Sequence, residues 1–255
     1  GGNDLIDTFF MVHDKGQLPE LKAKDPALAA ALAAARETGH SLTQPWKDTQ
    51  AAWRWSGPGA MSRQTLAWLG DHTRLGGVGR AIARATAEST GAPPPPLPWE
   101  AIRARADDAS DDLLFAVDTG AIRTVLTPDT RLSVLDLEDA RVAEGLRLAI
   151  EALKRIKARV PLLVVFIPTK ELVVADALGG LSAKPPASFD ALITHETALW
   201  TRVGTSLDAA SIPWVDSLPA LRGRVAGGDL PYRADHDGHP NDSGNAALAE
   251  AVSSA

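Results

Sequence analysis

Four titratable residues lie within five positions near the end of the chain: Asp235, His236, Asp237 and His239. Pro240 follows at once, which favours a loop, and loops on a rigid scaffold commonly present reactive groups. A histidine next to a carboxylate is typical of the base and its orienting group in nucleophilic catalysis. The carboxylate holds one imidazole tautomer and stabilises the imidazolium that forms during the reaction.

The same cluster has three other interpretations. Two histidines and two aspartates could bind a metal ion. They could form a solvated polar loop, or a histidine could be satisfied by backbone groups at the start of a helix. We expect neither a metal nor a cofactor.

The chain begins with Gly1, Gly2, Asn3 and Asp4. Glycine lets the backbone turn sharply and approach a ligand closely. The side-chain amide of Asn3 could donate a hydrogen bond to a developing oxyanion. The alternative is an ordinary turn, because glycine, asparagine and aspartate are common turn residues.

Together, residues 1–4 and 237–241 resemble the third and fifth conserved blocks of the SGNH (GDSL-type) hydrolase superfamily. The resemblance implies an α/β fold, a three-layer flavodoxin-like sandwich whose active site lies at the carboxyl ends of parallel strands. It implies that Asn3 and Gly2 belong to the oxyanion hole, that His239 is the general base and that Asp237 orients it. Asp235 is the reserve orienter.

The sequence departs from the family pattern in two features, the spacing of the aspartate and the histidine and the lack of the nucleophile motif. The two-residue spacing of Asp237 and His239 is similar to the polysaccharide O-acetyltransferase branch, which includes the alginate acetylation proteins. The family's nucleophilic serine stands in a Gly-Asp-Ser turn, which this sequence lacks, as it lacks a Gly-x-Ser-x-Gly elbow. We therefore expect the sequence to start at the third block, without its N-terminal strands and nucleophile, and to be inactive by itself.

The expected activity is hydrolysis of O-acyl esters, of the acetyl type, through an acyl-enzyme. The substrate would be a small-molecule or carbohydrate ester. The first alternative is O-acyl transfer, in which a sugar hydroxyl replaces water in the second half-reaction. The second alternative is a non-catalytic carbohydrate-binding or scaffold module with the same fold.

The elements that must position these residues follow an α/β pattern. Residues 136–159 carry an apolar stripe with helical spacing, and residues 160–167 form a continuous apolar run typical of a strand covered on both faces. We expect a helix from Ser188 to about 210, a short strand at 212–216 and a closing helix at 243–252. This alternation predicts a doubly wound layer within a single domain, 1–255.

The first half is less regular. Residues 25–39 predict a capped helix, and an insertion is expected at 38–135. Within it, residues 91–100 form a proline-rich spacer, and residues 113–128 predict a hairpin that turns at 118–120. The tryptophans of this insertion could form a lid for sugar stacking or a small satellite core.

Lys170 and Glu171 follow the predicted strand and are expected either to edge the pocket or to form a surface ion pair. The formal net charge of −6 and the lack of a basic run argue against a nucleic-acid partner. No apolar stretch has the length of a membrane span. The absence of cysteine excludes disulfides and thiolate catalysis but leaves the compartment open.

Overall fold

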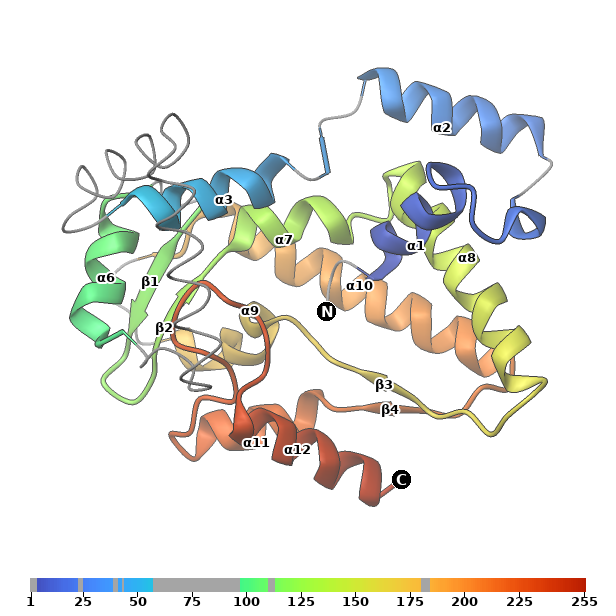
Figure 1. The fold of residues 1–255 in the computed structure, drawn as a ribbon. Helices are drawn as coiled ribbons and strands as arrows, with labels where there is room; N and C mark the ends of the chain where they lie inside the picture. Colours follow the sequence, from blue (N-terminus) through green and yellow to red (C-terminus); the bar gives the residue numbers. More distant parts are fainter. Residues whose placement is uncertain are drawn as a thin grey trace, which may run out of the picture.

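The computed structural model describes residues 4–22, 25–38, 41–42, 44–56, 97–109, 113–179 and 184–255. It is a mixed α/β fold in which helices dominate (Figure 1). The helices are α1 (Asp4–His13), α2 (Pro26–Thr38), α3 (Gln44–Trp55), α6 (Trp99–Asp107), α7 (Pro128–Leu135), α8 (Ala140–Lys157), α9 (Lys170–Val174), α10 (Ala187–Ala209), α11 (Leu218–Ala226) and α12 (Asp242–Ser253), with 3-10 turns η1 (Pro19–Leu21) and η2 (Ala175–Leu178). The strands are β1 (Phe115–Asp118), β2 (Arg123–Leu126), β3 (Val164–Phe166) and β4 (Trp214–Asp216).

Strands β3 and β4 form a parallel pair, in register from Val164 opposite Trp214 to Phe166 opposite Asp216. Figure 1 shows α10 above this pair and α11 and α12 below it. The strand predicted at 212–216 is present as β4, whereas the one predicted at 160–167 is confirmed only over three residues. Val160 and Leu163 are 51% and 40% exposed, because pairing with β4 covers only the end of the apolar run.

An apolar groove of about 390 Å³ lies beside β3, lined mainly by side chains of α8 and α10. Within the described residues, β3 is paired along one edge only.

The predicted helices after the insertion are confirmed, with shifted ends. In α8, Asp139 caps the N-terminus by accepting a hydrogen bond from the backbone N–H of Arg141. Val142 and Leu146, on the apolar stripe of this helix, lie in the main core. Helix α10 begins at Ala187, one residue before its predicted start at Ser188.

The hairpin predicted at 113–128 is confirmed as β1 and β2, which pair antiparallel. The Asp118 carboxylate accepts a hydrogen bond from the Gly120 N–H at 3.0 Å, and Gly120 has a positive φ of 79°, which suits a residue without a Cβ. The hairpin packs against α6, which starts at Trp99 after the proline-rich spacer. Residues 91–96 of that spacer lie outside the described residues.

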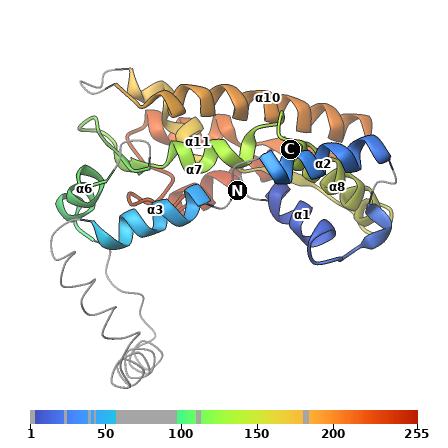
Figure 2. The ribbon, with the colours of Figure 1, turned by 90° about the horizontal axis from the view of Figure 1, so that it is seen from above.

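Helix α7 follows the hairpin and lies between α3 and α10 (Figure 2). It contributes Val134 and Leu135 to the same core as α8 and α10. Of the tryptophans, Trp46 is 51% exposed, whereas Trp53 packs against a small cluster formed by α6, Leu114 and β2. Trp68 lies outside the described residues.

Candidate functional site

A loop of residues 227–241, between α11 and α12, carries the predicted base and its orienting carboxylates; we call it the C-terminal loop. Asn241 closes it. Its side-chain N–H groups donate to the carbonyls of Leu230 and Tyr232 at 2.7 and 3.0 Å, and its side-chain oxygen caps α12 by accepting from Gly244. One side chain therefore both shapes the loop and starts the helix.

The C-terminal loop is also tied to elements far away in the sequence. The backbone N–H of Val125, in β2, donates to the Ala234 carbonyl at 2.9 Å. The hydroxyl of Tyr232 is buried and donates to the Pro168 carbonyl at 2.6 Å, just after β3. The loop is thus held against the end of β3 and the hairpin at once.

The structure brings Asp237 and His239 together. The ring Nδ1 of His239 lies 2.5 Å from Oδ1 of Asp237, and the backbone N–H of His239 donates to the same oxygen at 3.0 Å. Burial raises the pKa of Asp237, but the hydrogen bonds from His239 outweigh it and hold this pKa below its usual value. The carboxylate is therefore an acceptor, so the proton of the neutral ring is on Nδ1 and its Nε2 carries a lone pair.

The His239 side chain is 87% exposed, and its Nε2 has no hydrogen-bond partner among the described residues. This nitrogen is thus free to accept a proton from a group that enters the site.

Asp235 stabilises the C-terminal loop and does not hydrogen-bond to the His239 ring. Its carboxylate pairs with the Arg233 guanidinium at 3.0 Å and accepts the Asp237 backbone N–H at 3.0 Å. Arg233 also lies 3.7 Å from the Asp237 carboxylate.

Lys170 and Glu171 do not form the surface ion pair weighed from sequence, because both are 1% exposed. The Lys170 ammonium lies under the C-terminal loop and donates to the carbonyls of Arg233, Asp235 and Asp237 at 3.2, 2.6 and 3.3 Å. Burial lowers the pKa of Lys170 to about 8, although nearby carboxylates oppose the shift. Glu171 accepts the backbone N–H of Thr127 at 2.7 Å.

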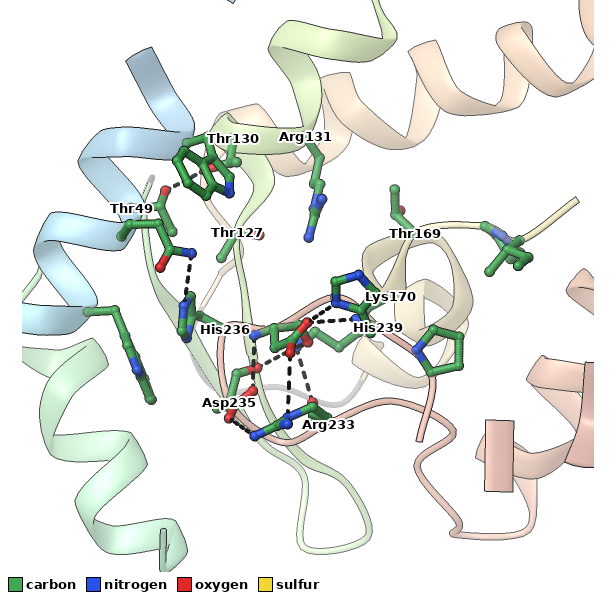
Figure 3. A pocket seen from close by; sticks show the side chains of 18 of the residues that line it. Thr49, Thr127, Thr130, Arg131, Thr169, Lys170, Arg233, Asp235, His236 and His239 are labelled. Carbon is green, nitrogen blue, oxygen red and sulfur yellow. Dashed lines mark hydrogen bonds and ion pairs between the residues drawn. The ribbon is translucent and has the colours of Figure 1, made fainter. Parts of the chain in front are cut away.

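The loop borders a cleft of about 760 Å³, which we call the main cleft (Figure 3). Its walls come from α1, α3, α7, the segment after β3 and the C-terminal loop. The lining includes Asp7, Trp46, Thr49, Gln50, Trp53, Thr127, Thr130, Arg131, Thr169, Lys170, Arg233, Asp235, His236, Asp237, Gly238 and His239.

The hydroxyl groups of the main cleft are all threonines in the described residues, and each is occupied. Thr49 and Thr130 hydrogen-bond to each other, Thr127 donates to Glu171, and Thr169 donates to Glu196. No serine lines the described part of the cleft, so the described residues supply a base and its orienting carboxylate but no hydroxyl partner for His239.

Asn3 and Gly2, predicted for the oxyanion hole, lie outside the described residues. The description begins at Asp4, the first residue of α1, and Asp7 on that helix lines the main cleft.

The sequence analysis offered the tryptophans of the insertion as a possible lid, but it did not predict the helix that forms one wall of the main cleft. Helix α3 presents Trp46, Thr49, Gln50 and Trp53 to it, and these positions (i, i+3, i+4 and i+7) mark a single helical face. This spacing, visible in the sequence, could have predicted that the four residues share one face of a helix. Arg131 on α7 also lines the cleft, and nothing in the local sequence distinguished it.

His236 does not act as a second free base. The Gln50 amide lies 3.1 Å from its Nε2, and the ring stacks on Trp53 with centroids 4.5 Å apart. Burial lowers the pKa of His236 to about 4, so the ring is neutral near pH 7.

Within the part of the chain that the structure describes, no group of three histidine, aspartate or glutamate side chains is arranged to hold a metal ion. No helix among these residues has both the length and the apolar character to cross a bilayer. Comparison with known proteins finds no matching family model and no significant match to a curated protein or a solved structure.

Proposed function

We propose that the protein is a serine ester hydrolase that acts on O-acyl esters through an acyl-enzyme, with His239 as general base and Asp237 as its orienting group. The observation that carries this proposal is the Asp237–His239 pair, which leaves Nε2 of an exposed ring at the rim of a large cleft. The attacking serine is proposed to come from outside the described residues.

The proposed reaction has two halves. The serine hydroxyl transfers its proton to Nε2 of His239 as its oxygen attacks the ester carbonyl, and the Asp237 carboxylate stabilises the imidazolium. The imidazolium then protonates the leaving alkoxide as the ester C–O bond breaks, which leaves an acyl-enzyme. Water then gives a proton to His239 and attacks the acyl group. The bond between the acyl carbon and the serine oxygen breaks, the imidazolium returns its proton to that oxygen, and the acid and the free serine are released.

The oxyanion would be held by the Asn3 amide together with backbone N–H groups, with Gly2 allowing close approach. Support comes from α1, which begins immediately after these residues and places Asp7 on the wall of the main cleft.

For the fold, we propose a three-layer flavodoxin-like sandwich. Three features support it. Strands β3 and β4 are parallel, helices lie on both sides of them (Figure 1), and an apolar groove beside β3 offers room for a further strand. The residues that follow β3, Pro168 to Lys170, line the main cleft. That location agrees with the rule that open α/β sheets bind ligands at the carboxyl ends of their strands.

O-acyl transfer is the second candidate. The two-residue spacing of Asp237 and His239, which resembles the polysaccharide O-acetyltransferases, favours it, and the spacing is compatible with a direct hydrogen bond. The two activities share the first half-reaction and differ only in whether water or a sugar hydroxyl receives the acyl group.

The test is hydrolysis of 4-nitrophenyl acetate by the complete polypeptide that the gene encodes, with and without a glycan acceptor. We expect turnover that His239→Ala removes while the circular dichroism spectrum stays unchanged. Acetylated acceptor would identify transfer. No turnover with either acceptor would overturn both enzymatic proposals and favour the non-catalytic module.

A further inference from the structure

Arg131 presents a guanidinium group to the main cleft and has no counter-ion in the described part of the chain. Figure 3 shows the side chain pointing from α7 into the cleft, toward Lys170 and His239. It is half-buried, and no described residue forms a hydrogen bond or an ion pair with its guanidinium. A half-buried guanidinium without a protein partner keeps its N–H donors available to a ligand.

The position of this guanidinium is built into the fold. Its helix, α7, is anchored in the main core by Val134 and Leu135. Its Nη2 lies against Gly238, where an ideal Cβ would come within 2.3 Å of it. Gly238 is the residue between Asp237 and His239, so the guanidinium lies directly beside the proposed catalytic pair.

Among the residues that the structure describes, the other charged groups of the main cleft leave Arg131 as its available cation. Lys170 is saturated by three carbonyl groups, and Arg233 pairs with Asp235. Asp237 is occupied by His239. Asp7 is the one cleft carboxylate without a partner among the described residues; it is exposed and lies on α1.

The positive charge of Arg131 acts on its neighbours. It lowers the pKa of Lys170 and of His236, after the larger effect of burial on each. The guanidinium thus adds positive charge to this part of the main cleft, where the carboxylates of Asp235 and Asp237 act in the opposite direction.

We propose that the main cleft binds a ligand that carries an anionic oxygen group, a carboxylate or a phosphate, and that Arg131 binds this group. A guanidinium presents N–H donors in a planar fork that matches both anions, and such charge-assisted pairs are the strong ones. That the ligand is the acyl ester itself rests on the proposed function; the anion site does not.

The test uses three probes that differ only at C6: methyl glucoside, methyl glucuronoside and methyl glucoside 6-phosphate. Sugar probes are chosen because Trp46, which is 51% exposed, lines the cleft and aromatic side chains suit contact with sugars. Binding to the 255-residue chain is followed by NMR through the Nε–Hε signal of Arg131. We expect at least one anionic probe to shift this signal and to bind roughly 10- to 100-fold more tightly than the neutral one.

Arg131→Gln should bring the three affinities together. The matched control is Arg123→Gln, on the hairpin outside the cleft, which should leave the anion preference unchanged. Asp7→Asn should strengthen anion binding slightly, because it removes a repelling charge. Circular dichroism verifies the fold of each variant.

No shift of the Arg131 signal with either anion, or an anion preference that survives Arg131→Gln, would overturn the proposal. A preference for the carboxylate alone or for the phosphate alone supports it and identifies the ligand class. Because binding needs no turnover, the anion site can stand while the ester hydrolase proposal fails, and the reverse also holds.

Discussion

The ammonium group of Lys170 donates a 2.6 Å hydrogen bond to the backbone carbonyl of Asp235, from beneath the loop that carries the His239 imidazole. The same ammonium reaches the carbonyls of Arg233 and Asp237. A buried charge thus fixes the backbone of the proposed catalytic loop without contacting the imidazole.

Replacement of Lys170 by methionine should destabilise the protein by roughly 1–3 kcal/mol, because buried carbonyl groups lose their donor. Urea unfolding at pH 7 measures the loss. Lys154→Met, at an exposed lysine paired with Glu151, is the control and should change stability by less than about 0.5 kcal/mol. Equal effects of the two substitutions would contradict the structural role of Lys170.

The orienting role of Asp237 predicts a large kinetic effect in the complete polypeptide. Asp237→Asn should lower kcat by roughly 10⁴-fold, because an amide can donate to Nδ1 and so favour the wrong imidazole tautomer. Asp235→Asn should have a much smaller effect, since Asp235 contacts Arg233 and the backbone rather than the ring. If Asp235→Asn is the more damaging change, the orienting group has been misassigned.

Gly238 and Gly244 predict stability losses of different size for the same substitution by alanine. A Cβ at Gly238 would meet the end of the flexible Arg131 side chain, whereas one at Gly244 would lie 2.1 Å from the Pro231 carbonyl oxygen. Gly238→Ala should therefore cost less than about 1 kcal/mol of stability but displace Arg131 and weaken anion binding. Gly244→Ala should cost several-fold more, as a thermal melt of the two variants would show.

Glu196 predicts a pH-dependent stability. Its side chain is fully buried, and burial raises its pKa to about 7 from 4.5. The folded state therefore holds a proton that the unfolded state releases between pH 4.5 and 7, so this carboxyl stabilises the fold at pH 4.5 and loses that contribution as the pH rises through 7. The change is roughly 3 kcal/mol.

The measurement compares wild type with Glu196→Gln by urea unfolding at pH 4.5, 6 and 8. The depressed pKa of His236 contributes in the opposite direction over part of this range, so the difference between the two proteins is read rather than either slope alone. The variant should gain stability relative to wild type as the pH rises. A constant difference would refute the assignment.

Local patterns predicted the elements with strong periodicity, such as α8 and α12, and the turn chemistry of the β1–β2 hairpin. The pairing of Asp237 with His239 was also predictable, because only one residue separates them. The residues that complete the main cleft were not. Gln50 meets His236 across 186 positions, and no local rule predicts that Lys170 is buried. The length of β3 is set by how many of its residues pair with β4. The apolar sequence of the strand does not contain that information.

Because Asn241 caps α12, the position of the His239 imidazole depends on the first turn of that helix. The side-chain amide that caps α12 also donates hydrogen bonds to the carbonyls of Leu230 and Tyr232. If the first turn of α12 unfolds, these hydrogen bonds break and the His239 ring is no longer held in position. Amide hydrogen exchange at Gly244 and at His239 should therefore report one shared opening event, a single cooperative unit at the carboxyl end of the chain.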